Sequence, residues 1–133
     1  MIQTNNFSYA DDGQSYLGIM AHDNSFQGKR PVVLVAHTWA GQSQFETDKA
    51  IELAKLGYLA LAIDVYGEGK RAKDNTEAEE LMNEVATDRQ KLLERIMLAF
   101  NSILTKIRCE YLRFIIMTLK KDFSFWRTLV TSL

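Results

Sequence analysis

The sequence predicts an α/β fold, and three features of the chain lead to this prediction. Two short apolar runs, at residues 32–36 and 58–63, are typical of strands that are buried on both faces of a sheet. A helical pattern of apolar residues lies between them, from Ser43 to about Leu56. Strand, helix and strand in this order predict a βαβ unit with parallel strands and a right-handed crossover.

An N-terminal hairpin is expected to precede this unit, with strands at residues 7–10 and 14–20. The turn contains Asp12-Gly13, and Asp-Gly between alternating apolar residues is a strong signal for a hairpin. The polar segment at residues 22–30 contains a glycine and is expected to be a loop.

The helix of the βαβ unit has sequence signals at both ends. Ser43 and Glu46 form a capping box, in which the Ser43 hydroxyl accepts one free N–H of the first turn and the Glu46 carboxylate reaches back to another. Gly57 follows the last turn and can adopt the left-handed conformation that ends a helix.

Two more helices are expected after the second buried strand, at about residues 77–85 and 88–105. Each begins with a capping-box pattern, formed by Thr76 with Glu79 and by Thr87 with Gln90. The apolar residues of the second helix share one face, as in a helix that packs on a sheet: Leu92, Ile96, Ala99, Phe100 and Ile103.

The composition is that of an ordinary globular domain, with 133 residues, 47% apolar residues and 25% charged residues. The net charge of −1 gives no reason to expect a nucleic acid or a membrane as a partner. A single cysteine excludes an internal disulfide and favours the cytoplasm. Residues 1–9 lack the regions of a signal peptide, and no apolar stretch approaches the ~20 residues of a membrane-spanning helix.

The charge of the chain changes sign near residue 101. Residues 1–100 hold 10 basic and 15 acidic side chains, whereas residues 101–133 hold 6 and 2. No glycine or proline follows Gly69, which is unusual because the turns of an α/β protein commonly need glycine. We therefore expect an α/β part at residues 1–100 and a divergent, basic and apolar, helical tail at residues 101–133.

The candidate site residues follow the first buried strand. The ligand crevice of an open α/β sheet lies just outside the carboxyl ends of its strands, which is where His37, Thr38, Trp39 and Gly41 occur. For His37, a place near the site is favoured over a role in proton transfer, and a backbone bond that finishes the strand is the alternative. Trp39 either lines a pocket or packs on the edge of the sheet.

Other reactive side chains have a structural interpretation. Ser43 lies in half of a nucleophile pattern, but helix capping already accounts for it. Cys109 follows Arg108 with no histidine near it in sequence, so a packed or partly exposed thiol is favoured over a nucleophile. Asp64 ends the second buried strand and is expected to cap the loop at residues 65–69. No metal-site spacing and no nucleotide-binding glycine motif is present, so neither a metal nor a cofactor is expected.

From the hairpin to about Phe100, the chain resembles the dienelactone hydrolase family of α/β-hydrolases. The resemblance is carried by four stretches together with the helix that follows the first: Val33–Gly41, Leu56-Gly57-Tyr58, Ala60–Gly67 and the Glu-rich segment Glu77–Met82. It implies an α/β-hydrolase-like fold and the hydrolysis of a small ester or lactone by a Cys-His-Asp triad.

The resemblance also implies roles for the loop after the first buried strand. In the family this loop donates a backbone N–H to the oxyanion hole, and by position the donor here is the amide of Trp39, with His37 and Thr38 beside it. A second donor comes from the residue after the nucleophile. The family often has a glutamate just before the first donor, where this chain has Thr38.

The chain departs from the family pattern in its catalytic residues. In α/β-hydrolases the nucleophile lies in a G-x-C-x-G or G-x-S-x-G pentapeptide, because the glycines permit a strained strand-to-helix turn that exposes the nucleophile. No such pentapeptide occurs in this chain. Both His22 and His37 come early, whereas the order in this fold is nucleophile, acid, histidine. We therefore expect no catalytic triad residue in the chain, an incomplete fold that lacks the C-terminal half, and no activity alone. A frameshift or premature end would explain the tail.

A second interpretation is a non-catalytic fragment or a module that binds a partner. Loss of the later strands would leave a strand edge open, and such an edge permits self-association. A basic, aromatic tail that binds a membrane surface or a partner helix is less favoured, because its apolar residues lack a clear helical period.

Overall fold

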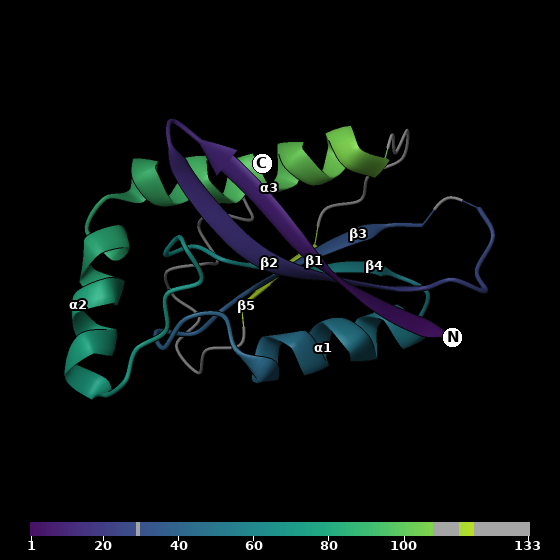
Figure 1. Ribbon diagram of the computed structural model, residues 1–133, viewed down its shortest axis with the longest axis horizontal. Helices are drawn as coiled ribbons and strands as arrows, with labels where there is room; N and C mark the ends of the chain where they lie inside the picture. Colours follow the sequence, from purple (N-terminus) through teal and green to yellow (C-terminus); the bar gives the residue numbers. More distant parts are fainter. Residues whose placement is uncertain (29, 108–114, 119–133) are drawn as a thin grey trace.

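The computed structural model describes residues 1–28, 30–107 and 115–118 and shows a mixed sheet with three helices (Figure 1). The strands are β1 (Ile2–Asp11), β2 (Gln14–Asp23), β3 (Val32–Ala36), β4 (Leu59–Ile63) and β5 (Ile115–Thr118). The helices are α1 (Gln44–Lys55), α2 (Asn75–Ala86) and α3 (Arg89–Ile107). None of these helices is long and apolar enough to cross a membrane.

The sheet has the order β1-β2-β4-β3-β5. β1 pairs antiparallel with β2, and β2 pairs antiparallel with β4. β4, β3 and β5 are parallel, with β3 in the middle. The predicted βαβ unit is confirmed, because α1 connects β3 to β4 and these two strands are neighbours.

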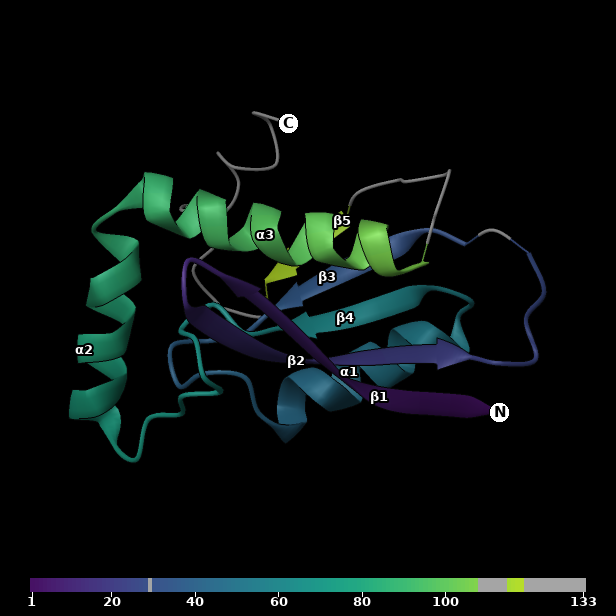
Figure 2. The same cartoon turned by 45° about the horizontal axis from the view of Figure 1, so that its top comes forward.

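The helices cover both faces of the sheet, with α1 on one side and α3 on the other (Figure 2). Each central strand therefore buries both of its faces, and all five residues of β3 and of β4 are buried. On the α1 side the contact is made of small side chains, which let helix and sheet approach closely: Ala21, Ala50, Ala54, Ala60 and Ala62. On the α3 side larger residues fill the space, among them Leu34, Leu61 and Ile96.

The predicted hairpin and first helix are confirmed. Asp11 pairs with Gln14, which leaves a two-residue turn, and the strands extend beyond the expected ends so that residues 22 and 23 belong to β2. At α1 the capping box of Ser43 and Glu46 is present with both of its bonds. Gly57 ends the helix at a φ of +93°, and its N–H donates to the Ala54 carbonyl.

The capping residues predicted for the other two helices are wrong. α2 begins earlier, because the carboxylate of Asp74 accepts the N–H of Glu77, and aspartate is among the strongest N-caps. The Thr87 hydroxyl donates to the Asn83 carbonyl at the end of α2, and Asp88 accepts the N–H of Lys91 at the start of α3. In both cases an aspartate close to the threonine takes the capping position.

The expected change near residue 101 does not coincide with an element boundary, since α3 continues without a break to Ile107. The expectation of a helical tail is wrong at the tail residues beyond α3 that the structure describes. There Ile115–Thr118 forms β5, which pairs with β3 from Val33 to Ala36. Three adjacent apolar residues, of which two are β-branched isoleucines, favour a strand in this position. The expected apolar tail beyond residue 118 lies outside the described residues.

Candidate functional site

The candidate site lies at the carboxyl ends of β3 and β4. Ala36 and Ile63 are paired at the last step of the parallel ladder, so the loops that follow the two strands start side by side. The first loop comprises residues 37–43 and the second comprises residues 64–73. The first loop begins with the three residues that the sequence analysis proposed for the site: His37, Thr38 and Trp39.

His37 joins the two loops and has no free ring nitrogen. Its Nε2 atom accepts the N–H of Val65 at 3.0 Å, so the proton of the ring lies on Nδ1, which donates to the Thr38 carbonyl at 2.7 Å. The side chain is 8% exposed, and this burial lowers the pKa of the imidazole. His37 is therefore neutral and fully bonded, which suits a structural link and not a general base.

Asp64 organises the second loop, as the sequence predicts. Its carboxylate is 1% exposed and accepts backbone N–H groups from Tyr66, Gly67 and Gly69 at 2.8–3.1 Å. It also accepts the N–H of Leu17 on β2 at 3.1 Å. Four donors on one carboxylate hold the loop in a single shape, because any change of shape would leave a buried charge unpaired.

The first loop is fixed by hydrogen bonds to its carbonyl groups. The Thr38 carbonyl accepts the N–H of Gly41, and the Trp39 carbonyl accepts the hydroxyl of Tyr66 at 2.7 Å. The Ala40 carbonyl accepts the N–H of Ala72 at 2.9 Å. These bonds tie the first loop to the second at two separate points.

Arg71 adds a further bond between the loops. Its Nε atom donates to the carbonyl of Gln42, while the Gln42 amide donates to the Thr47 hydroxyl on α1 at 2.9 Å. Gly41 lies directly against the second loop at a φ of +97°, where a Cβ would collide with the Lys70 carbonyl. Only glycine fits this conformation and this approach.

Glu46 holds the first loop from the side of α1. Its carboxylate, 1% exposed, accepts the N–H and the hydroxyl of Ser43 at 2.8 and 2.7 Å. The other oxygen accepts the N–H of Thr38 at 3.4 Å. The Ser43 hydroxyl is therefore part of the capping box, and this accounts for Ser43 without a nucleophilic role.

Arg95 on α3 is a site residue that the sequence analysis missed. Its guanidinium donates to the Val65 carbonyl at 2.7 Å and lies 5.7 Å from the centre of the Tyr16 ring. The side chain of Glu84 lies 3.9 Å from it. An arginine on an amphipathic helix looks like an ordinary surface residue in the sequence, so no local signal could have assigned this contact.

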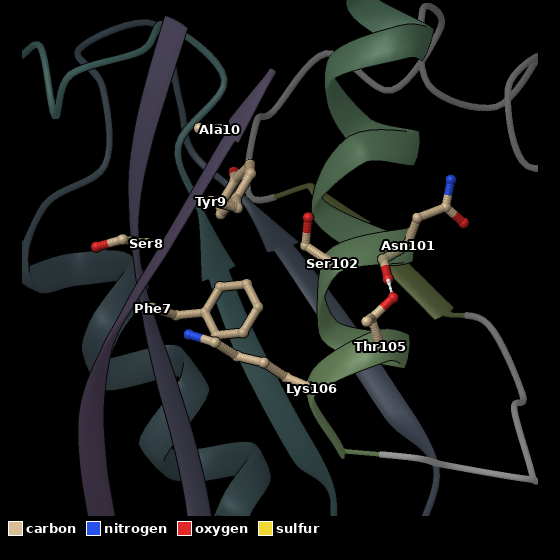
Figure 3. Close-up of a pocket in the computed structure, with 8 residues that line it drawn as sticks. All are labelled: Phe7, Ser8, Tyr9, Ala10, Asn101, Ser102, Thr105 and Lys106. Atoms are coloured by element: carbon tan, nitrogen blue, oxygen red, sulfur yellow. Dashed lines mark hydrogen bonds between the residues drawn. The ribbon is translucent and has the colours of Figure 1, made fainter. Parts of the chain in front are cut away.

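A groove of about 310 Å³ lies elsewhere, between β1 and the last turns of α3 (Figure 3). Lys106 covers the ring of Phe7 in this groove, with its Nζ atom 4.6 Å from the ring centre. The groove is open and contains none of the residues of the two loops. Within residues 1–28, 30–107 and 115–118, no group of three His, Cys, Asp or Glu side chains could hold a metal ion. Cys109 lies outside the described residues.

A model of the dienelactone hydrolase family matches residues 17–117 of the chain. The chain belongs to the dienelactone hydrolase family. The matched segment begins within β2, contains both loops of the site and extends through most of β5. It therefore reaches beyond Phe100, where the resemblance read from the sequence stopped.

Solved structures of dienelactone hydrolases share the fold of the chain. The protein named m3DLH superposes with a TM-score of 0.83 at 23% identity, over 98% of this chain and 55% of its own. A dienelactone hydrolase-like promiscuous phosphotriesterase from metagenomic libraries superposes with a TM-score of 0.86 at 20% identity. The superposition covers 98% of this chain and 54% of the phosphotriesterase. A structure from Klebsiella pneumoniae that carries the name dienelactone hydrolase superposes with a TM-score of 0.69 at 21% identity. The superposition covers 89% of this chain and 50% of that structure.

The chain thus spans about half the length of these structures, in agreement with a partial α/β-hydrolase-like fold. No curated protein sequence matches the chain.

Proposed function

We propose that the chain provides the oxyanion-loop half of a dienelactone hydrolase active site, for a small ester or lactone, and does not hydrolyse such substrates by itself. The observation that carries the proposal is the fixed first loop, whose carbonyls at Thr38, Trp39, Ala40 and Gln42 all accept hydrogen bonds. A loop held in this way keeps its backbone donors in place before a substrate binds, which is the requirement for an oxyanion hole.

The second part of the proposal rests on the nucleophile and the base. The sequence contains no G-x-C-x-G or G-x-S-x-G pentapeptide, and Ser43 is engaged in helix capping. The imidazole of His37 has both nitrogens bonded, so it offers no lone pair to activate a nucleophile. The fully assembled triad of the family is therefore not expected in this chain.

A turnover assay with p-nitrophenyl butyrate tests the proposal. We expect the purified chain to release nitrophenol no faster than the same chain unfolded in urea, because surface nucleophiles act equally in both. Cys109→Ala and Ser43→Ala should leave the rate of nitrophenol release unchanged. Saturable hydrolysis by the folded chain that Cys109→Ala abolishes would show that a nucleophile is present, and the proposal would then be wrong.

Self-association is a second candidate function, favoured by the position of β5. In the described sheet β5 is the last strand and pairs only with β3, so its other edge has no partner strand among the described residues. An open parallel edge can pair with a second copy. Light scattering after size exclusion tests this candidate: a dimer is expected at micromolar concentration, and a monomer over the whole range would contradict it.

The place of action is proposed from composition alone. A chain with one cysteine and an overall charge of −1 suits the cytoplasm, and it gives no reason to propose a nucleic-acid partner. No cofactor is proposed, because the hydrolysis of esters by this family type needs only side chains, backbone amides and water.

A further inference from the structure

We propose that the backbone N–H of Ala40 is an oxyanion donor and that the hydroxyl of Tyr66 is the positioning group that aims it. The inference deepens the proposed function, on which it rests, because it adds a donor next to Trp39 and assigns a role to a side chain of the second loop. It follows from the peptide unit that joins Trp39 to Ala40.

The direction of this peptide unit is set by Tyr66. The Trp39 carbonyl accepts the Tyr66 hydroxyl at 2.7 Å. In a trans peptide the carbonyl and the N–H of the same unit point in opposite directions, and the described chain has no cis peptide bond. Tyr66 is 6% exposed, so the Trp39 carbonyl is held against a buried side chain, and the Ala40 N–H lies on the opposite side of the same peptide unit, away from Tyr66.

The Ala40 N–H has no hydrogen-bond acceptor within the described part of the chain. Three other amides of the same loop donate within the protein: Gly41 to the Thr38 carbonyl, and Thr38 and Ser43 to the Glu46 carboxylate. Backbone N–H groups in folded proteins are almost always paired with protein, water or ligand. A half-buried, unpaired donor in a fixed loop is therefore suited to an exogenous acceptor.

Tyr66 is itself held rigidly. Its backbone N–H donates to the Asp64 carboxylate at 3.1 Å, and its ring lies 4.5 Å from the ring of His37. Burial raises the pKa of the Tyr66 hydroxyl to about 12, so the group remains a donor at neutral pH. The donor at Ala40 is thus oriented in advance, and it needs no rearrangement when negative charge develops near it.

The ligand class that fits one unpaired amide in this place is a tetrahedral oxyanion. In the proposed function this is the oxyanion formed when a nucleophile adds to an ester carbonyl. Methylphosphonate reproduces the tetrahedral, negatively charged oxygens without any bond being made or broken. Dimethyl sulfone, which is also tetrahedral but uncharged, serves as the matched probe without the charge.

The test is a titration of the ¹⁵N-labelled chain with methylphosphonate, followed by the backbone amide resonances. We expect a saturable downfield shift of the Ala40 amide proton, and no such shift with dimethyl sulfone. Tyr66→Phe keeps the ring and removes the hydroxyl, and it should weaken the affinity about fivefold or more, the value of one hydrogen bond. Tyr58→Phe, at the opposite end of β4, should bind as the unmodified chain does.

Two results would overturn the inference. An Ala40 resonance that does not move at millimolar methylphosphonate would exclude the amide as an oxyanion donor, whatever the behaviour of the variants. Equal affinity of Tyr66→Phe and the unmodified chain would exclude the positioning role. Neither result depends on turnover, so the failure of this inference is distinguishable from a failure of the proposed function.

Discussion

The Nε2 atom of His37, just after β3, accepts the backbone N–H of Val65, just after β4, at 3.0 Å. The bond joins the ends of two parallel strands and requires a neutral imidazole. Burial lowers the pKa of His37, so the folded chain resists protonation there.

A pH dependence of stability follows from this bond. Unfolded His37 titrates near the ordinary value of about 6.5, whereas folded His37 titrates lower, so below that pH the unfolded state binds more protons. Its contribution is therefore fully present above about pH 6.5 and declines as the pH falls toward the folded pKa, by at most about 1.4 kcal/mol per pH unit. Urea unfolding at pH 7.5 and 5.5 measures this loss.

His37→Asn should remove that part of the pH dependence, while His22→Asn is the matched control and should retain it. The same slope in both variants would mean that the pH dependence comes from other groups and that the neutral state of His37 is not linked to folding.

Asp64→Asn should destabilise the chain by about 3 kcal/mol, because an amide nitrogen would replace an oxygen that accepts backbone N–H groups and would face donors in a buried place. Asp48→Asn, on the exposed side of α1, is the control and should change the free energy of unfolding by less than about 0.5 kcal/mol. Comparable losses in the two variants would contradict the role of Asp64. Urea midpoints measure both.

Gly41→Ala should cost about 2 kcal/mol or more, since the residue has a positive φ and its Cβ would meet the Lys70 carbonyl. Gly28→Ala provides the comparison, with a φ of +108° and no atom within 4 Å of the added Cβ, and should cost about 1 kcal/mol. Thermal unfolding of both variants separates the close approach from the strained φ. If the two losses were equal, the packing of the two loops against each other would not matter.

Arg95→Met should loosen the second loop from α3, because it removes the donor to the Val65 carbonyl and keeps most of the apolar stem. We expect a loss of about 1 to 2 kcal/mol, from one charge-assisted hydrogen bond in a poorly exposed site. Lys91→Met removes an exposed ion pair with Glu84 and should cost under about 0.5 kcal/mol. If Arg95→Met and Lys91→Met had the same free energy of unfolding, the contact of Arg95 with the Val65 carbonyl would not contribute to stability.

Local sequence signals predicted the parts of the structure that depend on local interactions. The capping box of Ser43 and Glu46, the hairpin turn and the two buried strands each need only a few adjacent residues, and all are present. The loop-capping role of Asp64 was also predictable, because three of its donors lie within five residues of it.

Contacts between distant residues were not predictable in this way. Tyr66 lies 27 positions from Trp39, and Arg95 lies 30 positions from Val65, so no periodicity or spacing connects them. The strand β5 was missed because its pairing with β3 joins residues about 80 positions apart, and short apolar runs are ambiguous between helix and strand. At α2 the sequence analysis assigned the capping box to Thr76 and Glu79, but Asp74, two residues before Thr76, caps the helix.

Hydrogen exchange of the backbone amides tests the central claim most directly, namely that the two loops are already fixed in this chain. The account predicts slow exchange at the bonded amides of Gly41, Val65, Gly67 and Ala72, and fast exchange at Ala40, which directly precedes Gly41. Fast exchange at all of these amides, with protection confined to β3 and β4, would contradict it, because the oxyanion loop would then not be formed in advance.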